Sequence, residues 1–136
     1  MRIISLDEIR PVLENKSKVL DAVKRGFIDH SDGLIDMPEP IQMMFGAEHD
    51  AIIGDCHIKT ARSSALPYFC VKLATGFYNN PAQGLPVNNG LVMLLSSKTG
   101  QPVALFRDDG HMTSVRTAAA GALSCLLYTS PSPRDS

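Results

Sequence analysis

Hydrophobic residues in the first part of the chain recur at the spacing of helices. Residues 2–5 form a short apolar run, and Ser5 followed three positions later by Glu8 matches the capping box that begins many helices. We expect Pro11 and the polar residues 14–17 to interrupt this helix. A second helix should end at Gly33. Its apolar positions, three or four residues apart, are Val19, Leu20, Val23, Phe27 and Ile28.

Beyond residue 40 the pattern changes to short apolar runs that alternate with turn residues, which is typical of strands. The runs cover residues 41–46, 51–59, 68–78, 90–96 and 102–108. Residues 97–101 read as a hairpin turn, so the sheet should be antiparallel or mixed. An alanine-rich segment predicts a final helix from about Thr113, which Pro131 and Pro133 cannot continue. The predicted fold class is α+β, a sheet with flanking helices.

The composition of the chain argues against nucleic acid and membranes as binding partners. The 136 residues suffice for one domain with a hydrophobic core, and a formal net charge of -1 gives no reason to expect nucleic acid or an anionic membrane. Three cysteines without paired spacing favour a reducing compartment, so we expect a cytoplasmic protein. The charged N-terminus does not resemble a signal peptide, and the apolar runs are too short to span a membrane.

Two cations stand out as candidates for anion binding. Lys72 lies within an apolar strand, where it is either a solvated lysine or a cation that binds a substrate carboxylate. Arg116 lies near the start of the final helix, where a guanidinium would add to the anion preference of a helix N-terminus. The alternative for Arg116 is a surface arginine whose stem packs on the sheet. Gly, Pro and Asn crowd residues 76–90, as in many functional loops.

Metal binding and the common nucleotide motifs are not expected. His57 and His111, with Asp55, Asp108 and Asp109, match no common zinc spacing, so we predict no metal site. Asp108 and Asp109 most simply form the turn that leads into the final helix. The chain contains no GxGxxG, GxxxxGK[ST] or GxSxG motif.

Residues 3–124 resemble the N-terminal half of the ornithine cyclodeaminase/mu-crystallin family. The resemblance lies in VK-x-x-x-GF, N-x-x-x-GLP, T-G-x-P-x-A and T-x-x-RTAAAGA, which occur in that order between Val71 and Ala122. It implies an N-terminal α+β domain that binds substrate and forms a homodimer, followed by a Rossmann domain that binds NAD or NADP. Residues 1–124 would be that first domain.

The resemblance also implies roles for individual residues. Lys72 aligns with a lysine of the catalytic site that contacts the substrate carboxylate, and Arg116 with an arginine that clamps the same group beside the nicotinamide. Arg116, Thr117 and Asn88 fall where the family approaches its cofactor, with Asn89 beside them, and Val87 stands where several members carry Thr or Ser.

One position departs from the family. Many members carry a second carboxylate-binding arginine after a Met-Pro or Val-Pro pair, where this chain has Glu39, Pro40 and Ile41. Losing a guanidinium from an anion site can cost a few kcal/mol, so either another cation substitutes or the substrate differs. Lys59 and Arg62 are the nearest candidates.

The end of the chain also departs from the pattern of the family. Residues 125–136, CLLYTSPSPRDS, resemble the translation of a sequencing adapter, so we expect a non-native tail that replaces the Rossmann glycines and the catalytic aspartate of the family. The resemblance implies a parent enzyme that converts ornithine to proline and ammonia. The alternatives are a reductase of cyclic imino acids such as pyrroline-2-carboxylate, or a non-catalytic binding protein of the mu-crystallin type. Without its cofactor domain the chain alone should be inactive.

Overall fold

The described part of the chain forms seven strands, three α-helices and one short 3-10 helix. The computed structural model describes residues 1–46 and 51–129. In chain order the elements are β1 (Arg2–Ser5), α1 (Leu6–Leu13), α2 (Lys16–Ser31), β2 (Ile35–Asp36), β3 (Ile41–Phe45), β4 (Gly54–Ser63), β5 (Tyr68–Phe77), the 3-10 helix η1 (Asn80–Gln83), β6 (Asn88–Ser96), β7 (Pro102–Arg107) and α3 (His111–Thr129).

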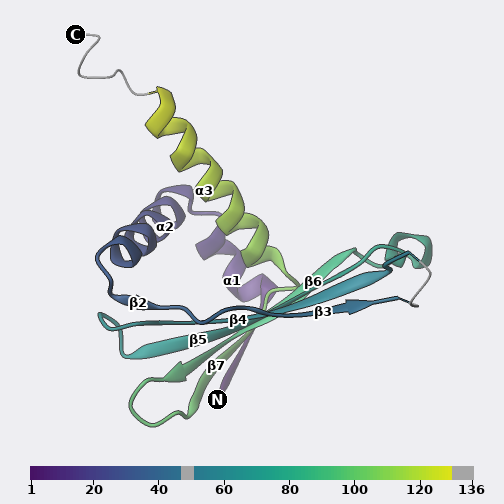
Figure 1. The fold of residues 1–136 in the computed structure, drawn as a ribbon, viewed down its shortest axis with the longest axis horizontal. Helices are drawn as coiled ribbons and strands as arrows, with labels where there is room; N and C mark the ends of the chain where they lie inside the picture. The colour runs from purple at the N-terminus through teal and green to yellow at the C-terminus, as the bar shows by residue number, and fades with distance from the viewer. Residues whose placement is uncertain (47–50, 130–136) are drawn as a thin grey trace.

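The strands form one mixed sheet in the order β1-β7-β6-β5-β4-β2, with β3 also paired to β4. Every pairing is antiparallel except that of β1 with β7. The three α-helices gather on one side of the strands (Figure 1). The predicted α+β class and mixed sheet are therefore confirmed, as is the hairpin between β6 and β7.

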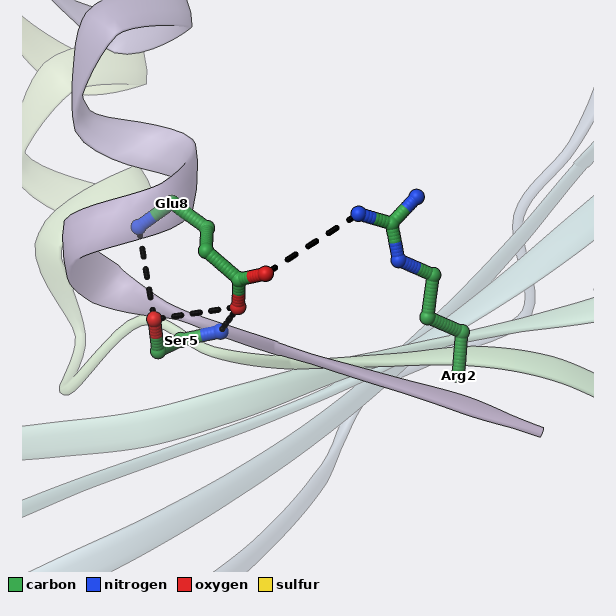
Figure 2. Close-up of polar contacts among 3 residues, drawn as sticks. All are labelled: Arg2, Ser5 and Glu8. Atoms are coloured by element: carbon green, nitrogen blue, oxygen red, sulfur yellow. Dashed lines mark hydrogen bonds and ion pairs between the residues drawn. The ribbon is translucent and has the colours of Figure 1, made fainter.

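The start of α1 follows from its sequence. The Ser5 hydroxyl oxygen accepts the Glu8 backbone N–H at 3.3 Å, and the Ser5 N–H donates to the Glu8 carboxylate at 2.8 Å (Figure 2). The guanidinium of Arg2, on β1, lies 3.9 Å from the same carboxylate. This capping box satisfies backbone N–H groups that the first helical turn leaves free, and it confirms the predicted helix start.

The predicted interruption at Pro11 is wrong. Pro11 lies inside α1, which continues to Leu13. The interruption predicted at residues 14–17 is confirmed, because α1 ends at Leu13 and the Asn15 side chain accepts the Lys18 backbone N–H at 3.1 Å to begin α2. The second helix ends as predicted, with Gly33 at a φ of 74° just after the cap residue Asp32.

The hydrophobic core is smaller than the chain length predicts. The apolar residues that are buried in the described part of the chain are Ile9, Ala104 and Ala119. The cause is the layering, since helices lie on one side of the strands (Figure 1). We call the other side the open face; Ile3, Ile41 and Met43 point to it and are 56%, 63% and 57% exposed.

The last helix, α3, begins two residues before the predicted start and runs to Thr129. It therefore passes residue 124 without a break, and the predicted domain boundary there stays a prediction. Pro131 and Pro133 lie outside the described residues. Among the helices that the structure describes, none is both long and apolar enough to cross a bilayer.

Candidate functional site

Lys72 lies at the middle of the sheet, on the face that is turned towards α3. Its neighbours across the strands are Lys59 on β4 and Val92 on β6, and directly paired residues project to the same face. Arg62 lies three residues after Lys59 and so projects to the other face, where its guanidinium is 3.8 Å from the Asp36 carboxylate. Of the two cations that the sequence offers as substitutes for the missing arginine, only Lys59 shares a face with Lys72.

Positive charge gathers around Lys72. Partial burial lowers the pKa of Lys72 below its ordinary value of 10.5, and the charges of Arg116 and Lys59 lower this pKa further. Arg116, which the sequence singles out separately, thus lies near enough for its charge to act on Lys72. In the described ranges, none of these three cations has a carboxylate within 4.0 Å. An anion that enters between them would find unpaired donors.

Asp108 belongs to this site, although the sequence indicates only a turn residue. Its side chain is 1% exposed, and Oδ2 accepts the Met112 backbone N–H at 2.9 Å, which fixes the start of α3. Its negative charge also opposes the lowering of the Lys72 pKa. Oδ1 is buried and has no hydrogen-bond partner among the residues that the structure describes. An aspartate just before a helix is the signal that could have found the cap, whereas its proximity to Lys72 depends on the fold.

A second, smaller feature lies at the N-terminal end of α3. A cavity of about 130 Å³ is lined by Ala74, Thr75, Asn88, Asn89, Gly110, Thr113 and Ser114. Gly110 is required here, since its φ is 79° and a Cβ would lie 3.3 Å from the Asn89 backbone. Asn88 therefore borders the cavity, whereas Thr117 lies one turn further along α3 and donates its hydroxyl to the Thr113 carbonyl at 2.8 Å.

The residues that line the cavity can be compared with the needs of the NAD or NADP that the family resemblance implies. Amide and hydroxyl side chains line it beside the start of α3, which suits an uncharged polar group such as a carboxamide. Its volume is well below that of a pocket that encloses a whole ligand. These residues thus fit one end of a nicotinamide cofactor, with the exposed Arg116 and Thr117 on the neighbouring turns of α3.

The histidines do not form a metal centre in the described parts of the chain, where no three potential ligands gather. His57 Nε2 lies 3.7 Å from the Asp55 carboxylate. That carboxylate accepts the Tyr78 hydroxyl at 2.7 Å, a hydrogen bond that raises the pKa of Tyr78. Asp55 is thus engaged with neighbouring side chains and links β4 to the loop after β5.

Comparison with known proteins places this geometry in context. The model of the ornithine cyclodeaminase/mu-crystallin family matches residues 4–132. A protein of Rhizobium meliloti (strain 1021) named as a dehydrogenase, RB0419, is 39% identical over 123 residues, which cover 90% of this chain and 36% of that protein.

Two solved structures are also similar. An archaeal alanine dehydrogenase dimer with bound NAD has a TM-score of 0.73 and 29% identity, covering 89% of this chain and 35% of that one. The pyrroline-2-carboxylate reductase of Thermococcus litoralis, in complex with NADH and L-proline, has a TM-score of 0.71 and 26% identity, covering 89% and 36%. The chain therefore spans well under half the length of the relatives it matches.

Proposed function

Because the chain belongs to the ornithine cyclodeaminase/mu-crystallin family, we propose that it is the substrate-binding domain of an NAD(P)-dependent enzyme that acts at the α-carbon of an amino or imino acid. The observation that supports this proposal is that Arg116, on α3, acts electrostatically on Lys72, on β5, while neither cation has a carboxylate partner within 4.0 Å among the residues described. A substrate carboxylate supplies the missing negative charge.

In this proposal each side chain has a separate role in binding the substrate. Arg116 offers a planar pair of donors to one carboxylate, and Lys72 adds a compact charge from the sheet beneath it. Asp108 favours the charged form of Lys72 and, by capping α3, fixes the helix that carries Arg116. Asn88, Arg116 and Thr117 form the side on which we place the cofactor, which when bound supplies or accepts the hydride.

Two reactions share this binding step. In ornithine cyclodeamination the hydride leaves the α-carbon and later returns, whereas a dehydrogenase or reductase moves it once. The relatives carry names of both kinds, a cyclodeaminase as well as a dehydrogenase and a reductase, so both reactions stay candidates. A non-catalytic binding protein would keep Lys72 and Arg116 but would have no hydride transfer.

The test begins with the source DNA beyond the codon for Ser124. We propose that residues 1–124 are the native domain and 125–136 a non-native tail, so the native frame should continue into a nucleotide-binding domain. The longer protein should then interconvert NAD(P)H and NAD(P)+ with amino or imino acids. Lys72→Met and Arg116→Met should each lose most of this activity, because each removes a charged partner of the carboxylate. Lys98→Met, in the exposed turn between β6 and β7, is the matched control.

A frame that really encodes residues 125–136 and then stops would refute the tail and the enzyme together. Unchanged turnover in Lys72→Met would instead refute only the role of Lys72. A longer protein that binds an amino acid but transfers no hydride would favour the binding protein.

We further propose that two copies of the chain pair through the open face. Along this face, Ile3 on β1 pairs with Leu105, which pairs with Met93 on β6, and Ile41 and Met43 extend the apolar surface on β3. Exposed apolar residues on an uncovered sheet face are typical of an interface, and the archaeal relative is a dimer. Light scattering should give twice the chain mass, and Met43→Asp should give the single mass; a parent chain that is already monomeric at high concentration would refute the pairing.

A further inference from the structure

On the face of the sheet that is turned towards α3, one row of paired residues lies between Lys72 and the cavity. Asn88 on β6, which borders the cavity, pairs with Gly76, four residues beyond Lys72 on β5. Successive rows on one face of a sheet are about 7 Å apart. The row between these two, which we call the middle row, consists of His57, Ala74 and Gly90. A substrate that has its carboxylate at Lys72 and its α-carbon towards a cofactor at the cavity lies over the middle row.

His57 is the member of the middle row that has a polar side chain. Ala74 and Gly90 carry at most a methyl group, so they leave space above the sheet, and Ala74 also lines the cavity. His57 lies directly opposite Ala74, and opposed residues have Cβ atoms about 5 Å apart. The His57 side chain is 34% exposed, so a ligand can reach it. Within this row, His57 is therefore the side chain that can bind a polar group of the substrate.

Neighbouring side chains orient the His57 ring. Its Nε2 lies 3.7 Å from Oδ1 of Asp55, whose Oδ2 accepts the Tyr78 hydroxyl at 2.7 Å. A carboxylate beside one ring nitrogen favours the N–H on that nitrogen, so the other nitrogen, Nδ1, is left as a hydrogen-bond acceptor. A histidine that is oriented by a third group in this way is a common arrangement in sites that bind and transform substrates.

Resting on the proposed function, we infer that Nδ1 of His57 accepts a hydrogen bond from the α-nitrogen of the substrate. The two ends of the amino or imino acid are then bound by different groups, the carboxylate by Lys72 and Arg116 and the nitrogen by His57. The Asp55 carboxylate behind His57 favours the positive charge of an ammonium or iminium group. Without this acceptor the cations on the same face would repel such a group. His57 thus acts as a specificity residue that selects substrates with a nitrogen on the α-carbon.

The test compares L-alanine with propionate, which has the same carboxylate and methyl group but no nitrogen. Dissociation constants are measured on the 136-residue chain by NMR titration at low ionic strength, where exposed charges are least screened. His57→Phe keeps a ring but has no acceptor, whereas the side-chain oxygen of His57→Asn can take the place of Nδ1. The matched control is His30→Phe, on the exposed last turn of α2. Lys72→Met tests the carboxylate site separately.

We expect the parent chain to bind L-alanine about tenfold more tightly than propionate, the worth of one hydrogen bond to a charged group. His57→Phe should remove this preference by weakening the binding of L-alanine alone, and His57→Asn should retain part of the preference. Lys72→Met should weaken both ligands alike, and His30→Phe neither. The dispersion of the NMR spectrum of each variant verifies that it is folded.

Equal or tighter binding of propionate by the parent chain would overturn the inference and leave the carboxylate site standing. A preference for L-alanine that survives in His57→Phe would also overturn it, because another group would then bind the nitrogen. If neither ligand perturbs the resonances of β5 or α3, the proposed function fails, and the inference fails with it.

Discussion

The closest backbone approach beside the site gives a direct test of the structure. Gly90 on β6 lies so near β5 that a Cβ at this position would be 2.4 Å from the Leu73 carbonyl oxygen. Real Cβ atoms essentially never come within 3.0 Å of another heavy atom, so Gly90→Ala requires the strands to separate by at least about 0.6 Å. The obstructing atom is backbone and cannot rotate away.

The expected cost follows from this overlap. Forcing an extra methyl group into a well-packed position costs about 1–3 kcal/mol, and Gly90 lies two residues from Val92, the partner of Lys72. The same substitution at Gly26, inside α2, meets nothing within 4 Å and has no positive φ. Gly26→Ala should therefore raise the free energy of unfolding by about 0.5–1 kcal/mol, through its better helix propensity.

The two variants are compared by urea unfolding, followed by circular dichroism because the chain contains no tryptophan. Opposite shifts of the midpoint, down for Gly90→Ala and up for Gly26→Ala, are expected at an unchanged slope. If Gly90→Ala is as stable as the parent chain, β5 and β6 do not approach as described, and the placement of Lys72 relative to β6 loses its support.

Three further predictions concern the caps and the charge at the site. Ser5→Ala should lower the free energy of unfolding by about 1 kcal/mol, measured by the same urea titration, because the Glu8 backbone N–H loses its acceptor; an unchanged midpoint would mean that the capping box contributes nothing. Asp108→Ala should lower the free energy of unfolding by about 1 kcal/mol, because the Met112 N–H loses its acceptor. Asp108→Asn keeps an oxygen at this position and should cost less. Equal losses in both variants would contradict the capping role. Amino acid binding should weaken as the pH rises through the pKa of Lys72, which lies below 10.5, because the charged form that binds the carboxylate disappears there. Lys72→Arg should move this loss of binding to higher pH. If the pH profile of binding does not move, Lys72 is not the titrating group.

Local signals in the sequence predicted the local structure well. The Ser5–Glu8 spacing predicted the capping box that the structure contains, because both partners lie within one turn. The apolar runs predicted β3 to β7 within a few residues, since alternation and turn residues are also local. The prediction that Pro11 interrupts the first helix was wrong, because the cap at Asn15 decides where that helix ends.

Contacts between distant segments were not predictable in this way. The sequence indicates a short strand at residues 2–5 but not its parallel pairing with β7, a hundred residues later. The proximity of Asp108 to Lys72 likewise depends on how α3 returns over the sheet. The resemblance to a family supplied roles for Lys72 and Arg116, but the placement of Asp108 came from the fold alone.

The choice between Lys59 and Arg62 shows most clearly what the structure adds. Both cations were equal candidates in the sequence, where Lys59 ends a predicted strand and Arg62 follows three residues later; the structure places both on β4. An odd separation in a strand places two side chains on opposite faces, so only one of them can face Lys72. The register of β4 against β5 decides for Lys59, and a slip by one residue would have reversed the choice. Which of the two cations lies on the face of Lys72 is therefore a consequence of strand register.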